Sequence, residues 1–181
     1  MKLFFILISF TNMLFSFPVN ESILNIHATM VPKISLMDYN LPEHTIDNSV
    51  VIAIFYDSRN HKDALFLKKL IDTKYNQGIG SYKIKTKLVL YSDNLDIKAN
   101  VYYFFPTDPL NIRRGVKSAN LNQAITFSYS KKELKEGVML SVLVGIKVKP
   151  ILNLKVIKSR NIAFWPVFLN ISEIYKDEEH K

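Results

Sequence analysis

Apolar and polar positions follow one another along this chain in two distinct patterns. Short unbroken apolar runs, rich in β-branched and aromatic residues, are typical of strands buried on both faces of a sheet. Between them lie stretches with apolar residues at helical spacing, so the order strand, helix, strand recurs. The predicted strands are Ser49–Tyr56, Lys83–Tyr91, Asn100–Phe105, Gln123–Phe127 and Val138–Val144.

The stretches that follow three of these strands predict helices. His61–Tyr75 has its apolar residues on one face, and Leu110–Ala119 follows a cap residue and a proline at the first helical position. Ser130–Glu136 is shorter and begins with capping-box spacing. Strands alternating with helices predict βαβ units. We therefore expect an α/β fold with a mostly parallel sheet in a single-domain three-layer sandwich.

The segment before the first strand has a weaker pattern. Ser22–Met30 fits one short helix, and Lys33–Met37 alternates like a brief strand. The first residues, Met1–Ser16, combine one lysine with an apolar run that is short for a membrane span. We expect a secretory signal peptide over 1–16, and hence a periplasmic protein whose single domain covers 17–181. An uncleaved membrane anchor is the alternative.

The stretch from Gly137 to Tyr175 is expected to supply much of the core. After its first strand, Gly145 marks a tight turn into a second strand at Lys147–Lys149, and Ile151–Ser159 is amphipathic. An alternating strand places every second side chain on the same face. The core-facing positions are expected to be Val138, Leu140, Val142 and Val144.

Composition narrows the classes of function. The chain has 181 residues and is 48% hydrophobic, enough for one domain with a real core. Its formal net charge is +8, which suits acidic partners, but the scattered positions of the lysines favour a solvated basic surface. No cysteine is present, which excludes disulfides, thiolate catalysis and cysteine-based zinc sites.

No motif of a known catalytic or cofactor site occurs. The first strand–helix turn lacks glycine, so it does not match a dinucleotide site, and no Walker loop or nucleophile elbow is found. We expect no enzymatic activity, no cofactor and no metal. The histidines lack metal-ligand spacing and are expected at the surface: His27, His44, His61 and His180.

Three loops are expected to share one edge of the sheet, because the carboxyl ends of parallel strands meet there. A small ligand could bind at this edge, and Arg59 could hold an anion at the start of a helix. The alternative is that these are ordinary capping residues, and fold geometry alone predicts the convergence. The candidate site residues are Asp57, Ser58, Arg59, Thr107, Asp108, Ser128 and Tyr129.

Two side-chain groups allow a structural and a functional interpretation. Phe164, Trp165, Val167 and Phe168 form an aromatic cluster that is expected in the core, whereas an exposed Trp165 would mark a partner surface. Basic neighbours in the helix 110–119 indicate a solvated face. Nucleic acid is not expected as a partner, because aromatic residues are not interleaved with them and the chain is predicted to be exported.

The stretch Gly137–Tyr175 resembles the C-terminal part of the YfiR-like family of periplasmic proteins. The matching features are an apolar strand after glycine, a glycine turn, a helix start at Asn153 and a closing pair of large apolar residues. The same end is similar to the tail of ABC-type solute-binding proteins. The residues are Gly137-Val138-Met139-Leu140, Gly145, Asn153-Leu154-Lys155, Asn161-Ile162, Pro166 and Phe168-Leu169.

The resemblance implies a non-enzymatic regulator with the fold of one lobe of a periplasmic binding protein. Its implied partner is a membrane-bound diguanylate cyclase or sensor kinase, and a homodimer is left open. Similarity to the binding-protein tail implies the alternative, a module that captures a small solute. The chain departs from the family in two ways, since it lacks an evident aromatic-rich opening helix and the cysteines of some members.

Overall fold

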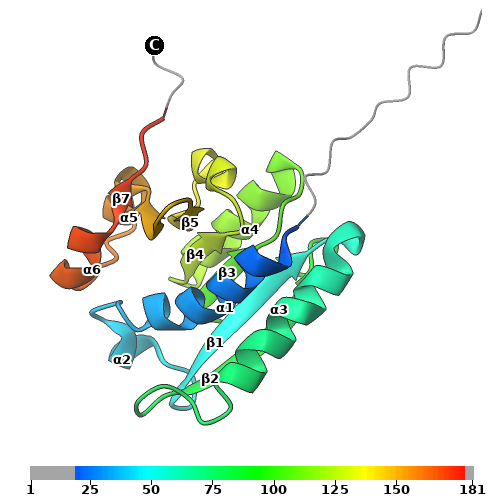
Figure 1. Cartoon of the computed structure of the whole chain (residues 1–181), viewed down its shortest axis with the longest axis horizontal. Coiled ribbons are helices and arrows are strands. Elements are labelled where there is room, and N and C mark those ends of the chain that lie inside the picture. The colour runs from blue at the N-terminus through cyan, green and yellow to red at the C-terminus, as the bar shows by residue number, and fades with distance from the viewer. Residues whose placement is uncertain (1–18, 178–181) are drawn as a thin grey trace, which may run out of the picture.

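A seven-stranded sheet in the order β2-β1-β3-β4-β5-β6-β7 forms the middle layer of the computed structural model, which describes residues 19–177 (Figure 1). Neighbouring strands from β2 to β5 run parallel. β6 is antiparallel to β5, and β7 is parallel to β6. The strands are β1 (Ser49–Tyr56), β2 (Lys83–Leu90), β3 (Val101–Phe104), β4 (Ile125–Ser128), β5 (Leu140–Val144), β6 (Val148–Leu152) and β7 (Glu173–Ile174).

Helices cover both faces of this sheet. α1 and α3 pack on one face, and α4 with the 3₁₀ helix η2 packs on the other (Figure 1). The remaining helices are short: α2 precedes β1, η1 follows β1, and α5 and α6 lie among the last strands. Their bounds are α1 (Glu21–Ser35), α2 (Leu41–His44), η1 (Ser58–Asn60), α3 (His61–Lys74), α4 (Pro109–Leu121), η2 (Lys131–Glu136), α5 (Leu154–Ser159) and α6 (Pro166–Ile171).

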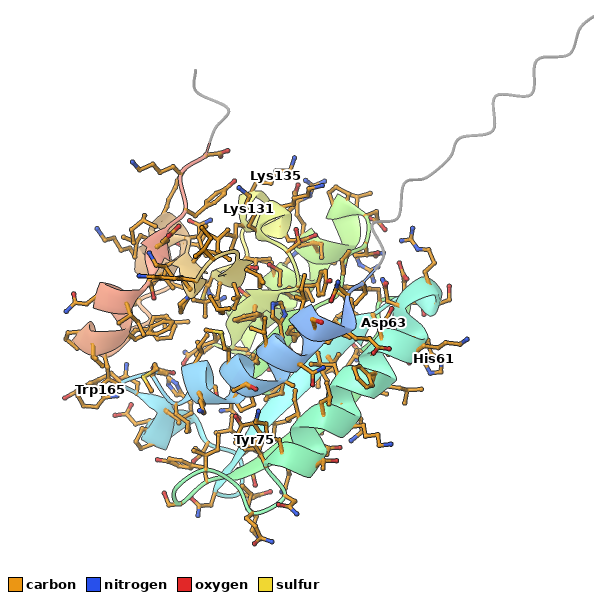
Figure 2. All side chains as sticks on the ribbon, in the orientation of Figure 1. His61, Asp63, Tyr75, Lys131, Lys135 and Trp165 are labelled. Atoms are coloured by element: carbon orange, nitrogen blue, oxygen red, sulfur yellow. The ribbon has the colours of Figure 1, made fainter. Side chains whose placement is uncertain are left out.

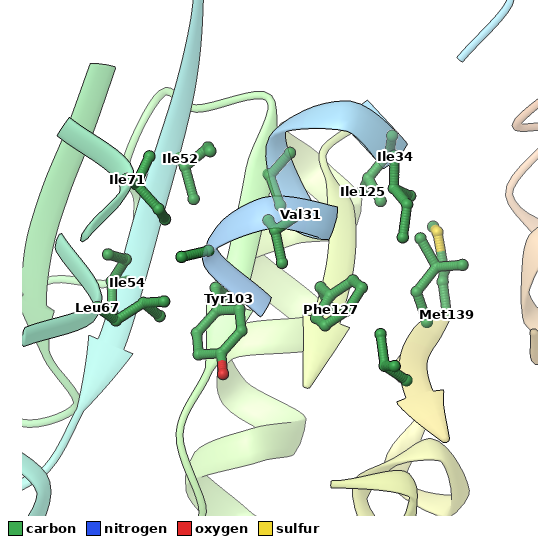
Figure 3. Packing of buried hydrophobic residues seen from close by; sticks show 14 of the residues in the cluster. Val31, Ile34, Ile52, Ile54, Leu67, Ile71, Tyr103, Ile125, Phe127 and Met139 are labelled. Atoms are coloured by element: carbon green, nitrogen blue, oxygen red, sulfur yellow. The ribbon is translucent and has the colours of Figure 1, made fainter. Parts of the chain in front are cut away.

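From Val50 onward strand β1 is apolar, because it lies between two cores. Ile52 and Ile54 pack with Leu67 and Ile71 of α3 (Figure 3). Phe55 points to the other side, into the core under α4. Side chains alternate between the faces of a strand, so burial on both faces demands apolar residues at every position.

The predicted fold class is confirmed. The structure is a single α/β domain with helices on both faces of a mostly parallel sheet. The predicted first strand agrees with β1 residue for residue, and the predicted strand Lys83–Tyr91 is one residue longer than β2. The helices predicted after β1 and β3 are α3 and α4.

The prediction of a strand at Lys33–Met37 is wrong, because α1 continues to Ser35. Asn20 caps the start of this helix by accepting hydrogen bonds from the backbone N–H groups of Ser22 and Ile23. Helical spacing then continues beyond Met30, because Val31 and Ile34 extend the buried stripe of the helix (Figure 3). Burial of this stripe outweighs the apparent alternation that indicated a strand.

The C-terminal stretch forms the predicted hairpin with different bounds. The second strand is β6, Val148–Leu152, so Ile151 and Leu152 belong to the sheet and only Leu154–Ser159 is helical. The strand predicted over 138–144 is shorter in the structure, where β5 begins at Leu140. Val138 and Met139 precede the strand and are fully buried. Val144 was expected in the core and is 43% exposed, because β5 extends beyond its pairing with β4 at Leu140.

None of the helices within residues 19–177 is long and apolar enough to cross a membrane. The predicted signal peptide, residues 1–16, lies outside the described residues.

Candidate functional site

The loops after β1 and β3 meet at the carboxyl edge of the sheet. The Thr107 hydroxyl donates a hydrogen bond of 3.2 Å to Asp57 Oδ2. Asn60 Nδ2 donates to the Pro106 carbonyl oxygen at 2.8 Å. Because β1 and β3 are adjacent and parallel, the residues that follow them are neighbours. The predicted convergence of these two loops is therefore present.

Arg59 is paired with Asp57. Its Nε atom lies 3.1 Å from Asp57 Oδ2, and its Nη2 atom contacts the same oxygen. Asp57 also accepts from the Arg59 backbone N–H, so it caps η1. Burial alone would raise the pKa of Asp57, but the hydrogen bonds and positive charge of Arg59 lower it below its usual value. Capping and internal pairing thus occupy much of the hydrogen-bonding capacity of this turn.

Asp108 has the corresponding role at α4. Its Oδ1 accepts from the backbone N–H of Asn111 at 3.0 Å, and its Oδ2 accepts from the Asn111 side chain at 2.6 Å. Asp108 is exposed, and its charge contributes to a raised pKa of Arg59, after the larger effects of Asp57. The edge therefore presents one arginine beside two carboxylates. Ser58, next to Arg59, is exposed and available to solvent.

The loop after β4 contributes differently. Ser128 is fully buried, and its hydroxyl donates to the Ser130 carbonyl oxygen at 2.8 Å. The half-buried Tyr129 accepts a hydrogen bond of 2.8 Å at its hydroxyl from the backbone N–H of Asn20. Tyr129 thereby attaches the start of α1 to the end of β4. The structure brings Asp57, Arg59, Thr107 and Asp108 together and places Ser128 and Tyr129 in packing roles.

Glu133 also belongs to this edge, although sequence reasoning identified it only as a partner of Ser130 in a capping box. Its Oε2 atom is buried without a hydrogen-bond partner among the described residues, and burial raises its pKa. Burial raises the pKa of the Tyr91 hydroxyl well above its usual value. The negative charges of Glu133, Asp57 and Asp108 raise this pKa further. Because this Glu133 oxygen is covered, a ligand N–H group could donate to it only after neighbouring side chains move aside.

A small pocket of about 50 Å³ lies at the opposite, amino end of the strands. Asp38 lines it, and His44 Nδ1 is 3.8 Å from Asp38 Oδ2. Burial raises the pKa of Asp38, against opposing effects of the Asn40 backbone N–H and of His44. Nothing in the sequence indicated this pocket, because its lining comes from three separate segments. They contribute Ser35, Asp38, Leu41, His44 and Ile46, then Lys98, Ala99 and Asn100, and finally Asn122, Gln123 and Ile125.

The prediction that His27 lies at the surface is wrong. His27 belongs to α1, and its side chain is fully buried between this helix and the sheet. Its Nδ1 atom makes a hydrogen bond of 2.8 Å with the Tyr103 hydroxyl. Burial lowers the pKa of His27 to about 3, so the imidazole is neutral at neutral pH. No group of three metal-ligating side chains was found over residues 19–177.

The aromatic cluster near the C-terminus divides between core and surface. Phe164 and Phe168 are buried, as expected. Trp165 is 45% exposed, and its ring packs against exposed Tyr39 with a centroid distance of 4.7 Å. Figure 2 shows Trp165 at the periphery of the molecule. We define the Trp165 surface as four exposed apolar residues on and beside α6, namely Tyr39, Trp165, Val167 and Ile171.

Two solved structures have a similar fold. A conserved domain protein from Vibrio cholerae has a TM-score of 0.58 and 14% sequence identity, with 84% of this chain and 60% of that chain covered. The ABC domain in complex with L-Trp from Streptococcus pneumoniae has a TM-score of 0.51 and 10% identity, with 78% and 62% covered.

At these identities the likeness defines the fold alone. The chain spans about three-fifths of the length of the two solved chains. No protein-family model matches the sequence, and no curated protein matches it.

Proposed function

We propose that the protein is a non-enzymatic periplasmic interaction protein that modulates a membrane-bound signalling partner, either a diguanylate cyclase or a sensor kinase. The observation that carries this proposal is the exposure of Trp165 beside Tyr39. The sequence resemblance to the YfiR-like family supports the type of partner. Nothing in the proposal requires a catalytic residue.

The Trp165 surface is held in place by backbone pairing. Tyr39 N–H donates to the Ala163 carbonyl oxygen at 2.8 Å, and Trp165 N–H donates to the Met37 carbonyl oxygen at 3.0 Å. The two aromatic side chains therefore project from a fixed antiparallel bridge between Asp38 and Phe164. Pre-organised aromatic residues lose little conformational entropy on binding and are enriched among residues that dominate interface energies.

Two residues of α6 extend this surface. Val167 is 63% exposed and Ile171 is 59% exposed, although both are aliphatic. They lie four positions apart and so share one face of the helix. Phe168 of the same helix is buried against Phe164, which fixes the orientation of α6. A partner that covers Val167, Ile171 and the two aromatic rings would remove apolar surface from water.

The experiment is capture of membrane partners by the full chain from detergent-solubilised envelope, with the bound proteins identified by mass spectrometry. A cyclase or kinase should bind the wild type, and Trp165→Ser should weaken its affinity at least about tenfold, as expected for loss of a buried aromatic anchor. Leu110→Ser is the matched control, because Leu110 is 66% exposed at the start of α4. Equal binding by the Trp165→Ser and wild-type proteins would overturn the assignment of this surface.

A second function, capture of a small solute, is favoured by the unpaired Oε2 atom of Glu133 at the carboxyl edge. We propose an amine-bearing ligand such as an amino acid, whose ammonium group would displace the side chains that cover Oε2 and bind Glu133. A ligand at about 100 times its Kd adds roughly 2.7 kcal/mol to stability. Thermal unfolding with L-Trp and other amino acids should then shift upward for the wild type and less for Glu133→Gln. A screen without any shift would exclude this second function and leave the first untouched.

A further inference from the structure

The tip of the β5–β6 hairpin stands apart from the rest of the sheet. Val144 and Val148 are the last cross-strand pair, and Gly145, Ile146 and Lys147 connect them. β4 pairs with β5 only at Leu140, and Val144 is four residues further along the strand. At about 3.3 Å per residue, the tip extends on the order of 13 Å beyond that pairing.

This tip carries aliphatic side chains where solvent-exposed hairpins ordinarily carry polar ones. Ile146 is fully exposed at the apex, and Val144 and Val148 are each 43% exposed. Cross-strand partners direct their side chains to the same face, so the two valines form one apolar pair below Ile146. Transfer of these exposed aliphatic side chains from water into an apolar environment is favourable.

Positive charge accompanies the apolar tip. Lys147 is exposed within it, and η2, which contacts β5, carries exposed Lys131 and Lys135. Figure 2 shows Lys131 and Lys135 on η2. The other charged groups of η2 offset them little, because Glu136 is paired with Arg113 at 2.7 Å. The tip Val144–Val148 itself contains no acidic residue.

We propose that the hairpin tip Val144–Val148 binds the surface of an anionic lipid bilayer, with Ile146 entering the boundary between headgroups and acyl chains. Aliphatic side chains next to lysines are the combination that such an interface accommodates, because the lysines remain among anionic headgroups while the apolar residues are buried. This contact goes beyond the proposed function and uses a surface separate from Trp165. It would hold the protein at the membrane in which its partner resides.

The absence of cysteine from the sequence permits a site-specific test in the full chain. Ile146→Cys is labelled with the fluorophore NBD, whose emission rises and shifts to the blue in an apolar environment. We expect a severalfold rise with phosphatidylglycerol vesicles and none with phosphatidylcholine vesicles. The control is Leu121→Cys, because Leu121 is 78% exposed at the far end of α4. α4 runs back from the carboxyl edge, so this probe lies at the other end of the sheet and should stay unchanged.

Two further variants test which side chains are responsible. Ile146→Ser should lower partitioning into anionic vesicles about tenfold, and Lys147→Ser about fivefold. Both positions are exposed, so folding should be unaffected. An unchanged emission at position 146, an equal rise at position 121, or an equal rise with phosphatidylcholine would each overturn the proposal. Trp165→Ser should leave the signal at position 146 intact, which keeps this test independent of the proposed function.

Discussion

His27 and Tyr103 join α1 to the centre of the sheet through a hydrogen bond of 2.8 Å between the imidazole Nδ1 and the phenol oxygen. Both side chains are fully buried. The imidazole also meets the rings of Phe127 and Tyr129 at centroid distances of 5.4 and 5.6 Å, and its Nε2 atom has no hydrogen-bond partner among the described residues. A polar pair in this setting makes stability sensitive to protonation.

The first prediction is a loss of stability in acid that depends on His27. The pKa of His27 is about 3 in the folded protein and about 6.5 when unfolded. Between these values the unfolded state binds a proton that the folded state does not, so the free energy of unfolding falls as pH falls. At about 1.36 kcal/mol per pH unit, the total loss is at most about 5 kcal/mol. Urea titrations from pH 7 to pH 4 measure it.

The control for this prediction is the double variant His27→Phe with Tyr103→Phe. Replacing His27 alone would leave the Tyr103 hydroxyl buried without a partner, which costs about 1–3 kcal/mol at every pH. The double variant removes both polar groups and should lose stability less steeply than the wild type below pH 6.5. If its pH dependence matches that of the wild type, His27 is not the group responsible.

A second prediction concerns Asp38, with the opposite sign. Burial is the largest cause of its raised folded-state pKa, so the folded protein retains a proton that the unfolded chain releases above its ordinary value of 3.8. The contribution of Asp38 to the free energy of unfolding is greatest below pH 3.8, and it is lost as the pH rises through the raised pKa. Asp38→Asn should therefore raise the urea midpoint at pH 7 and leave it unchanged at pH 3.

Asp38→Asn preserves the backbone contact that the carboxylate makes. Asp38 Oδ1 accepts from Asn40 N–H at 3.0 Å, and an asparagine side-chain oxygen can accept the same bond. Asp38→Ala, which removes that acceptor, is the contrasting variant. If both variants are destabilised equally at pH 7, the carboxylate stabilises the fold through His44 and its burial is not the dominant effect.

The sheet and its principal helices were predictable because their signals are local. β1 and β3 are buried on both faces, so each appears in the sequence as an unbroken apolar run. Asp108 and Pro109 mark the start of α4 by their own chemistry. The convergence of Asp57 and Thr107 followed from the rule that parallel strands end at one edge.

The remaining features depend on contacts between distant segments. His27 is buried because Tyr103, 76 positions away, supplies its hydrogen bond, and a histidine in an amphipathic helix gives no sign of this. Trp165 is exposed because the bridge between Asp38 and Phe164 turns its ring toward Tyr39. A pattern of apolar residues defines what a segment can bury, and the neighbours of each side chain decide which members of the pattern are buried.

The third prediction concerns Asn153, which the sequence identifies as a helix cap. The structure confirms the cap, since Oδ1 accepts from Val156 N–H at 3.3 Å, and adds a second bond from Nδ2 to the Leu134 carbonyl oxygen at 2.9 Å. Asn153→Ala should cost about 2 kcal/mol, the sum of about 1 for the cap and about 1 for the second bond. Asn153→Asp keeps the cap and loses the donor to Leu134. Equal urea midpoints for Asn153→Asp and the wild type would show that the second bond contributes nothing.

The last prediction tests where the core ends along β5. Leu140 is fully buried between β4 and β6, whereas Val144 on the same strand is 43% exposed. Leu140→Asp would bury an unpaired carboxylate or force its protonation, at a cost of several kcal/mol against a total stability of about 5–15 kcal/mol. Val144→Asp places the same group in water and should shift the urea midpoint little. Circular dichroism at increasing urea would compare the two variants. A Leu140→Asp protein that unfolds at the wild-type midpoint would contradict the central position of β5, and a severe loss from Val144→Asp would mean that the hairpin tip is covered.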